Sequence, residues 1–174
     1  MQIQRLIHKP EIKKACKFLD KYLGQGLHIP ENYYFDYMGR TAIFGGFNYG
    51  KLVAASSCKV LGHDDLSHID SYFLDNIKYE TTGFLESAAI KPKFRGQGFG
   101  KEMVNRRIDF LMSYGVTDIV ALCWLSGQER QSLPLLTKMG FTEVEHFIMP
   151  WAGEQCPVCG DDCSCNATLV HKKV

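Results

Sequence analysis

A glycine-rich turn between an expected strand and an expected helix constrains this chain more than any other feature. The turn reads FRGQGFG over residues 94–100, with glycine at positions 96, 98 and 100. Residues 82–92 before it form an extended apolar stretch, and residues 100–116 after it repeat apolar side chains at helical spacing. Glycines leave backbone N–H groups uncovered where a helix begins, and a helix N-terminus favours an anion. The pattern predicts an α/β unit with an anion-binding turn.

Other readings of the turn fit less well. A dinucleotide fingerprint needs G-x-G-x-x-G early in the fold, whereas here the third glycine comes one residue early and the turn follows three or four expected strands. A Walker A loop needs glycine and Ser or Thr where this chain has Arg95 and Glu102. A tight structural turn stays open as the alternative without a ligand.

The remaining elements follow from apolar periodicity and turn residues. Strands are expected at 2–7, 41–49, 51–61, 82–92, 118–126, 141–151 and 167–174, with helices at 11–23, 32–38, 100–116 and 127–140. Residues 62–81 read as a long polar connection. There is no internal repeat or linker, so residues 1–174 are expected to form a single domain with a mixed, mostly antiparallel sheet flanked by helices.

Charge and composition exclude several partner classes. The formal net charge is +1, which gives no electrostatic case for nucleic acid or an anionic membrane. No apolar run approaches the length of a membrane span, and the N-terminal residues lack the features of a signal peptide. We therefore expect a cytoplasmic protein with neither a nucleic acid nor a membrane as partner.

Two motifs together indicate a family. The stretch ESAAIKPKFRGQGFGKEMVNRRIDFL contains R-x-x-G-x-G, and TKMGF stands at 137–141, where a late strand opens. With the order of elements over nearly the whole chain, these motifs resemble the GNAT superfamily of acetyl-CoA-dependent N-acyltransferases. The resemblance implies the GNAT fold and transfer of an acetyl group from acetyl-CoA to a primary amine of a small molecule. Many members of the family also form homodimers.

The resemblance also implies where acetyl-CoA binds. Backbone N–H groups of the turn would hold the pyrophosphate, and the strand before it would pair with the coenzyme and hold the thioester carbonyl. The residues implied are Ala88, Ala89, Ile90, Arg95, Gly96, Gln97, Gly98, Phe99, Gly100 and Lys101. Arg95 and Lys101 add full positive charges near the expected anion.

Glu86 is the candidate catalytic base, because some small-molecule acetyltransferases of this family carry glutamate in the equivalent stretch. The alternatives are a solvated strand residue, or a carboxylate that binds the charge of the acceptor. The tyrosine that often protonates the leaving thiolate is absent, because that position is Leu136, and the frequent asparagine is Glu129. The acid would then be another tyrosine (Tyr33, Tyr34 or Tyr37), or the thiolate leaves unaided.

The acceptor side is less defined. The resemblance places it near residues 28–38 and the cysteine-rich segment, where the tyrosines would be core residues or the floor of an amine pocket. The connection HDDLSHID (63–70) reads as a solvated loop, a weak metal site or an acidic rim for a cationic amine. Cys123, like Cys16 and Cys58, reads as a buried core residue rather than a nucleophile.

A cysteine cluster near the C-terminus predicts a metal site. Cys156, Cys159, Cys163 and Cys165 form C-x2-C-x3-C-x-C within a loop at 152–166. Four thiolates are a common ligand set for closed, tetrahedral structural zinc, which leaves no open position for catalysis. Free thiols, a redox pair, or a mixed site with His146 or His171 remain alternatives.

These observations leave three functions open. The first is a small-molecule N-acetyltransferase with structural zinc that rigidifies one wall of the acceptor pocket. The second is a protein or peptide N-acetyltransferase. The third is a non-catalytic module that binds coenzyme A and regulates.

Overall fold

The computed structural model describes residues 2–24, 30–62, 81–125 and 132–174. The elements run in the order β1 (Gln2–Arg5), α1 (Lys9–Leu23), α2 (Tyr33–Asp36), β2 (Thr41–Asn48), β3 (Lys51–Val60), β4 (Thr82–Phe84), β5 (Ala88–Ile90), the 3₁₀ turn η3 (Pro92–Phe94), α4 (Phe99–Met112), β6 (Asp118–Leu125), α5 (Leu133–Lys138), β7 (Thr142–Phe147) and β8 (Asn166–Lys173). No helix within these ranges is long and apolar enough to cross a membrane.

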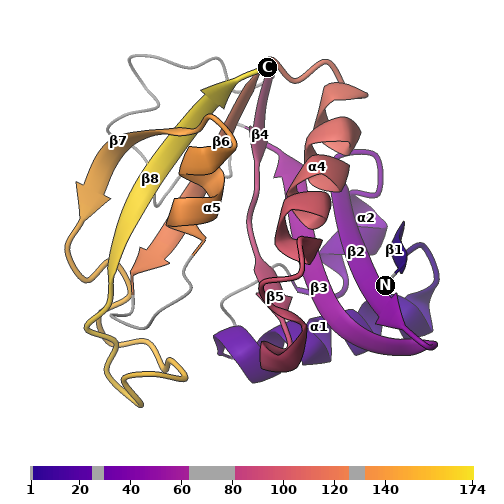
Figure 1. Ribbon diagram of the computed structural model, residues 1–174, viewed down its shortest axis with the longest axis horizontal. Helices are drawn as coiled ribbons and strands as arrows, with labels where there is room; N and C mark the ends of the chain where they lie inside the picture. Colours follow the sequence, from indigo (N-terminus) through magenta and orange to yellow (C-terminus); the bar gives the residue numbers. More distant parts are fainter. Residues whose placement is uncertain (1, 25–29, 63–80, 126–131) are drawn as a thin grey trace.

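One mixed sheet holds the molecule together. Its strands lie in the order β1-β2-β3-β4-β6-β8-β7, and β5 pairs with β3 beyond the end of β4 (Figure 1). Among the described strand pairs, only β4 and β6 run parallel, and the others are antiparallel. The prediction of a mixed, mostly antiparallel sheet flanked by helices is confirmed.

The helices cover the two faces of the sheet with separate apolar clusters. On one face, α1 and α2 pack their apolar side chains, among them Ile12, Leu19 and Tyr34, against β2, β3 and β5. On the other face, α4 and α5 pack Val104, Leu111 and Leu136 against the sheet. Pro10 lies in the first turn of α1 and does not break it, since the first N–H groups of a helix have no partner there.

The expected single strand at 82–92 is wrong. The segment forms two short strands, β4 and β5, separated by residues 85–87. β4 lies between β3 and β6, whereas β5 pairs with β3 alone among the described strands. Local apolar pattern does not reveal such a break, because it depends on the pairing of distant strands.

Several expected boundaries also move. The strand expected at 141–151 ends at Phe147, and β8 already begins at Asn166, inside the expected cysteine loop. The helix expected at 32–38 is one turn, Tyr33–Asp36. The helix expected at 127–140 begins at Leu133, with Pro134 in its first turn, and residues 126–131 lie outside the described ranges. The connection at 62–81 lies almost wholly outside them.

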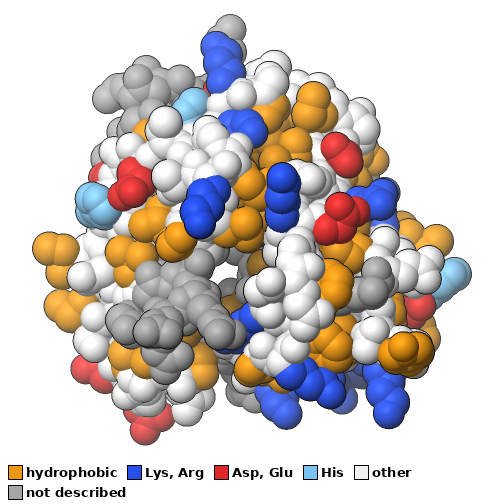
Figure 2. Space-filling view, viewed as in Figure 1, with side chains coloured by type: hydrophobic (Ala, Val, Ile, Leu, Met, Phe, Trp, Pro, Cys, Tyr) orange, Lys and Arg blue, Asp and Glu red, His pale blue; other side chains and the backbone are white. Residues whose placement is uncertain are grey.

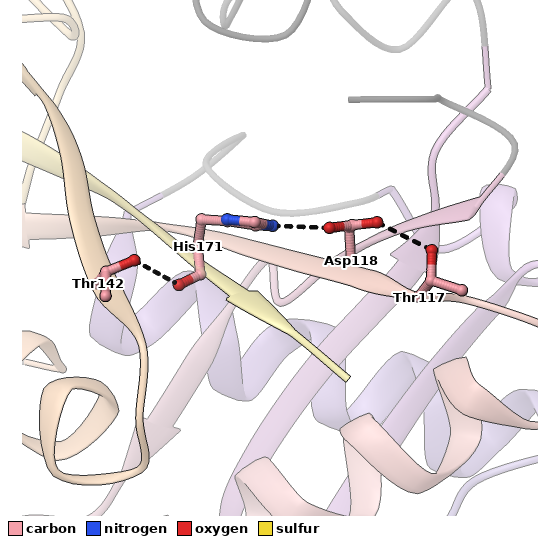
Figure 3. A network of polar contacts seen from close by, with 4 residues as sticks. All are labelled: Thr117, Asp118, Thr142 and His171. Atoms are coloured by element: carbon pink, nitrogen blue, oxygen red, sulfur yellow. Dashed lines mark hydrogen bonds and ion pairs between the residues drawn. The ribbon is translucent and has the colours of Figure 1, made fainter. Parts of the chain in front are cut away.

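A polar network joins the ends of three strands. His171 Nε2 of β8 lies 2.9 Å from Asp118 Oδ1 of β6, and the Thr117 hydroxyl donates to Asp118 Oδ2 at 2.8 Å (Figure 3). The Thr142 hydroxyl donates to the carbonyl oxygen of His171 at 3.2 Å. Burial acts to raise the pKa of Asp118, but the bonds from Thr117 and His171 outweigh it and hold that pKa below its usual value.

Candidate active site

The centre of the site is a β-bulge that carries Glu86. Lys59 of β3 is opposite Phe84, and Ser56 is opposite Ala88. Between these pairs β3 has two residues, 57 and 58, whereas the facing segment has three, 85–87. One extra residue bends the strand at this point and ends its regular ladder.

The bulge divides the sheet. The N–H of Leu85 donates to the carbonyl of Val120 in β6 at 2.9 Å, and the N–H of Glu86 donates to the carbonyl of Ser57 in β3 at 3.2 Å. Beyond this point the chain follows β3 only, while β6 continues beside β8. We call the space between β5 and the C-terminal half of β6 the split. The space-filling view shows the molecule hollowed there (Figure 2).

One edge of β5 faces the split with its main-chain groups. The carbonyl of Ser87 accepts from the N–H of Ser57, and the N–H of Lys91 donates to the carbonyl of Val53. Because antiparallel pairing alternates, the groups of odd-numbered residues face β3 and those of Ala88 and Ile90 face away from it. The N–H groups of Ala88 and Ile90 are therefore the ones placed to bind an extended ligand, whereas that of Ala89 is not.

The glycine turn begins α4 as the sequence predicts. Gly96 and Gly98 have φ of 73° and 84°, which non-glycine residues rarely adopt. Gly98 is the N-cap, and the helix starts at Phe99. Gly100 serves close packing instead, because a Cβ atom there would lie 3.0 Å from Leu135 Cδ2 of α5. The turn thus exposes the first N–H groups of a 14-residue helix.

Two side chains of the turn bind the main chain nearby. Arg95 Nε donates to the carbonyl of Ile90 at 2.9 Å, and Gln97 Nε2 donates to the carbonyl of Lys93 at 3.1 Å. Arg95 therefore ties the turn to the end of β5 as well as carrying charge. Beside the turn lies an open hollow of about 600 Å³, whose lining includes Gln97, Gly98 and Phe99.

Glu86 lies in a partly buried polar environment. Burial raises the pKa of Tyr34 well above its usual value, and the nearby Glu86 carboxylate raises it further. Burial also raises the pKa of Cys58 to about 12; Arg107 opposes this shift, and Glu86 adds to it. Glu86 thus lies close enough to two protonated buried groups to affect both.

The three candidate tyrosines lie in α2 or at its end, and Tyr34 is the one that lies near Glu86. Tyr34 is buried in the core under α1. Tyr33 and Tyr37 stack on each other with ring centroids 4.4 Å apart, and Lys59 Nζ lies 5.9 Å from the Tyr33 ring. Leu136, at the usual tyrosine position, is a buried core residue.

Cys16, Cys58 and Cys123 are buried, as expected for core residues. Burial raises the pKa of each thiol, to about 12 for Cys16 and Cys58, so none of the three is activated as a thiolate.

Sequence reasoning missed Arg107. It comes from α4, is 4% exposed, and donates from Nη1 to the carbonyl oxygens of Ser57 and Ser87 at 3.2 and 3.4 Å. These two carbonyls flank the bulge. A signal was present, because Arg107 lies four residues from Met103 and from Leu111, on the apolar stripe of the helix.

The cysteine cluster forms a compact group of four sulfur atoms. All four Sγ atoms lie within 4.8 Å of one another, and those of Cys159 and Cys165 are 3.4 Å apart. Tetrahedral zinc with Zn–S bonds of about 2.3 Å needs sulfur atoms about 3.8 Å apart, so the group fits that ion. The N–H of Cys159 donates to Cys156 Sγ at 3.1 Å, and main-chain bonds between Cys156 and Gly160 close the turn.

Both tryptophans of the chain pack against this cluster. Trp124, at the end of β6, and Trp151 lie against Cys156, Cys163 and Cys165. Hydrogen bonds, first from Ser164, lower the pKa of the exposed Cys159 thiol to about 6. His146 and His171 do not join the group, since their rings bind Thr168 and Asp118. Among the described residues, the mixed site is therefore not formed.

The chain belongs to the acetyltransferase (GNAT) family, whose model matches residues 13–141. This membership supports acyltransferase activity. No curated protein sequence matches the chain.

Solved structures share the fold over almost the whole chain. An acetyltransferase of the GNAT family from Streptococcus pneumoniae has a TM-score of 0.70 at 13% identity, covering 99% of each chain. The protein yncA from Salmonella typhimurium, solved with its cofactor acetyl-CoA, has a TM-score of 0.66 at 15% identity, covering 99% of this chain and 93% of that one. The ribosomal-protein-S18-alanine N-acetyltransferase from Escherichia coli has a TM-score of 0.64 at 16% identity, with the same coverage.

Proposed function

We propose that this protein transfers an acetyl group from acetyl-CoA to a primary amine of a small molecule, by direct attack in a ternary complex. The observation that carries the proposal is the split itself. The edge of β5 turned away from β3 continues into the glycine turn at the start of α4. An extended ligand with a terminal pyrophosphate suits that arrangement, because the strand edge binds its chain and the helix start binds its anion.

Acetyl-CoA would supply the thioester, and residues of this chain would hold it. The N–H groups at 98–101 would bind the pyrophosphate, with Lys101 adding charge. The N–H of Ala88 or Ile90 would polarise the thioester carbonyl, which is the role of an oxyanion-binding donor. Arg95 holds strand and turn in register through its bond to Ile90.

Glu86 would accept the proton of the attacking amine, directly or through water. In support of this role, the main chain of Glu86 is held at the start of the split, because the Glu86 N–H is bound to β3. A positioned base of this kind contributes about 10²- to 10⁴-fold to a rate. We propose that the thiolate leaves unaided, with Tyr34, which lies near Glu86, as the alternative acid.

A direct assay tests the function. Purified protein is incubated with acetyl-CoA and a panel of small primary amines, and release of the coenzyme thiol is followed together with the mass of the product. Acetylation of at least one amine supports the proposal. Coenzyme binding without turnover on any amine or peptide would indicate a regulatory module instead.

A polypeptide acceptor is the second candidate. The Escherichia coli neighbour is named for a protein acceptor, and exposed apolar side chains (Ile148 and Met149) lie before the cysteine cluster on the same loop. Peptides with a free N-terminus or lysine, assayed beside the free amines, separate the two acceptor classes.

We also propose that the four cysteines hold one structural zinc ion. The compact sulfur group carries this proposal, and four protein ligands would leave the ion no open position. The site would clamp the loop between β7 and β8 onto the end of β6 through Trp124. Metal analysis of the purified protein is expected to give one zinc per chain, and a metal-free protein with unchanged stability would contradict it.

A further inference from the structure

Arg107 is a buried cation that the proposed reaction does not use. α4 presents it to the sheet from the face opposite α1 and α2. Burial lowers the pKa of Arg107 to about 10, with Cys58 opposing, so the side chain remains charged at neutral pH. Burying a guanidinium is costly unless its N–H groups are bonded, and this one binds main-chain carbonyls of Met103, Ser57 and Ser87.

Two of those carbonyls define the bulge. The carbonyl of Ser57 also accepts the N–H of Glu86, and the carbonyl of Ser87 also accepts the N–H of Ser57. Nη1 of Arg107 therefore reaches both acceptors that join the bulge to β3. A regular ladder would not need it, because in such a ladder each strand satisfies its neighbour.

We propose that Arg107 is a positioning residue, whose guanidinium fixes the bulge that carries Glu86 and starts the split. It does not touch the reacting atoms. Through the bulge it sets the direction of Glu86 and the register of the β5 edge. This inference rests on the proposed acetyl transfer only for its kinetic readout.

The main test replaces Arg107 by Met and by Lys. Arg107→Met removes the charge and all three side-chain hydrogen bonds, while Arg107→Lys keeps the charge but loses the planar fork. The matched control is Arg40→Met, because Arg40 Nη2 also donates to a main-chain carbonyl, that of Leu61, away from the bulge. Each variant is measured for kcat, for KM of acetyl-CoA and of the amine, and for the pH dependence of kcat.

We expect Arg107→Met to lower kcat at least tenfold and to move the acidic limb of the pH profile, that is, the fall of kcat at low pH. The bulge then lacks the donor that binds both of its acceptors on β3, so the surroundings of the Glu86 carboxylate change. In Arg107→Lys the limb should stay in place while kcat falls several-fold. A general loss of stability would not separate the two variants in this way. The inference is wrong if both variants fold and have the same kcat, and the same fall of kcat at low pH, as Arg40→Met.

Amide hydrogen exchange keeps the test independent of turnover and of folding yield. Exchange of residues 85–91 in Arg107→Lys is expected to be at least tenfold faster than in the wild-type protein, with α1 unchanged. Unchanged exchange at 85–91 would overturn the role of Arg107 even if no acceptor is ever found. A wild-type protein that acetylates nothing would overturn the proposed function instead.

Discussion

Arg95 Nε lies 2.9 Å from the carbonyl oxygen of Ile90 and donates a hydrogen bond to it. The bond joins the end of β5 to the glycine turn, so the two parts of the proposed coenzyme site move as one. Replacing Arg95 by Met should weaken acetyl-CoA binding about threefold to tenfold, the value of one hydrogen bond of about 0.5–1.5 kcal/mol.

Calorimetric titration measures this effect, and Arg95→Lys is the informative partner variant. Lysine keeps the charge but lacks the Nε donor, which is one of the nitrogens of the planar guanidinium. We expect Arg95→Lys to bind as weakly as Arg95→Met. Full recovery with lysine would mean that charge alone matters and that the tie to Ile90 does not.

The conformation of Gly98 makes a second prediction. Alanine at φ 84° lowers the free energy of unfolding by about 1–2 kcal/mol. In Gly98→Ala the turn should change its backbone conformation to relieve this strain, and the protein should then bind acetyl-CoA more weakly. The control is Gly50→Ala in the β2–β3 turn, which has φ 71° and open space around it. Thermal melts should show similar losses in both variants, but only Gly98→Ala should bind the coenzyme more weakly.

Many of the helices and strands can be predicted from the pattern of apolar and turn residues along the sequence. Apolar periodicity predicts α1, α4, β6 and the β2–β3 hairpin, since each is settled by neighbouring residues and turns. The bulge at 85–87 escapes local pattern because it arises where β4 leaves β6 and continues along β3.

Apolar spacing predicts the buried face of α4 only in part. Met112 is half exposed, whereas Phe110 and Arg107 are buried. The sequence does not show whether a charged residue on an apolar stripe is buried or exposed. Burial depends on main-chain carbonyls that bind the charged group, and only the fold shows these.

Glu86→Gln tests the proposed base. Glutamine is nearly the same size but cannot accept a proton at neutral pH, so kcat should fall about 10²- to 10⁴-fold. The dissociation constant of acetyl-CoA should change less than about twofold, because Glu86 is not expected to bind the coenzyme. Stopped-flow or steady-state kinetics with the best amine supplies the first value, and titration supplies the second. Unchanged kcat would leave Glu86 without a chemical role.

Metal removal tests the cysteine cluster. Because both tryptophans lie against it, chelation should change the intrinsic fluorescence and lower the melting temperature. Cys163→Ala should bind no zinc, whereas Cys123→Ala, a buried cysteine in the core, should keep one ion per chain. Equal zinc content in the two variants would contradict the site.

The Asp118–His171 pair makes stability depend on pH. The pKa of Asp118 is lowered on folding, so its contribution is present above the unfolded value and lost as pH falls through the folded one. Asp118→Asn should therefore cost about 1 kcal/mol or less at about pH 6, and less at about pH 3, where pH is below the unfolded pKa. Urea unfolding at both pH values checks this, and an equal cost at both would contradict the role of ionised Asp118.

The most direct test of the central claim is a thermal melt with saturating acetyl-CoA. A ligand that binds only the folded protein at a hundred times its dissociation constant stabilises it by about 2.7 kcal/mol. For a chain of this length the melting temperature should rise by about 5–10 °C, with no comparable rise for NAD or ATP. No rise with acetyl-CoA would mean that the split and the glycine turn are structural, and the proposed acetyl transfer would be wrong.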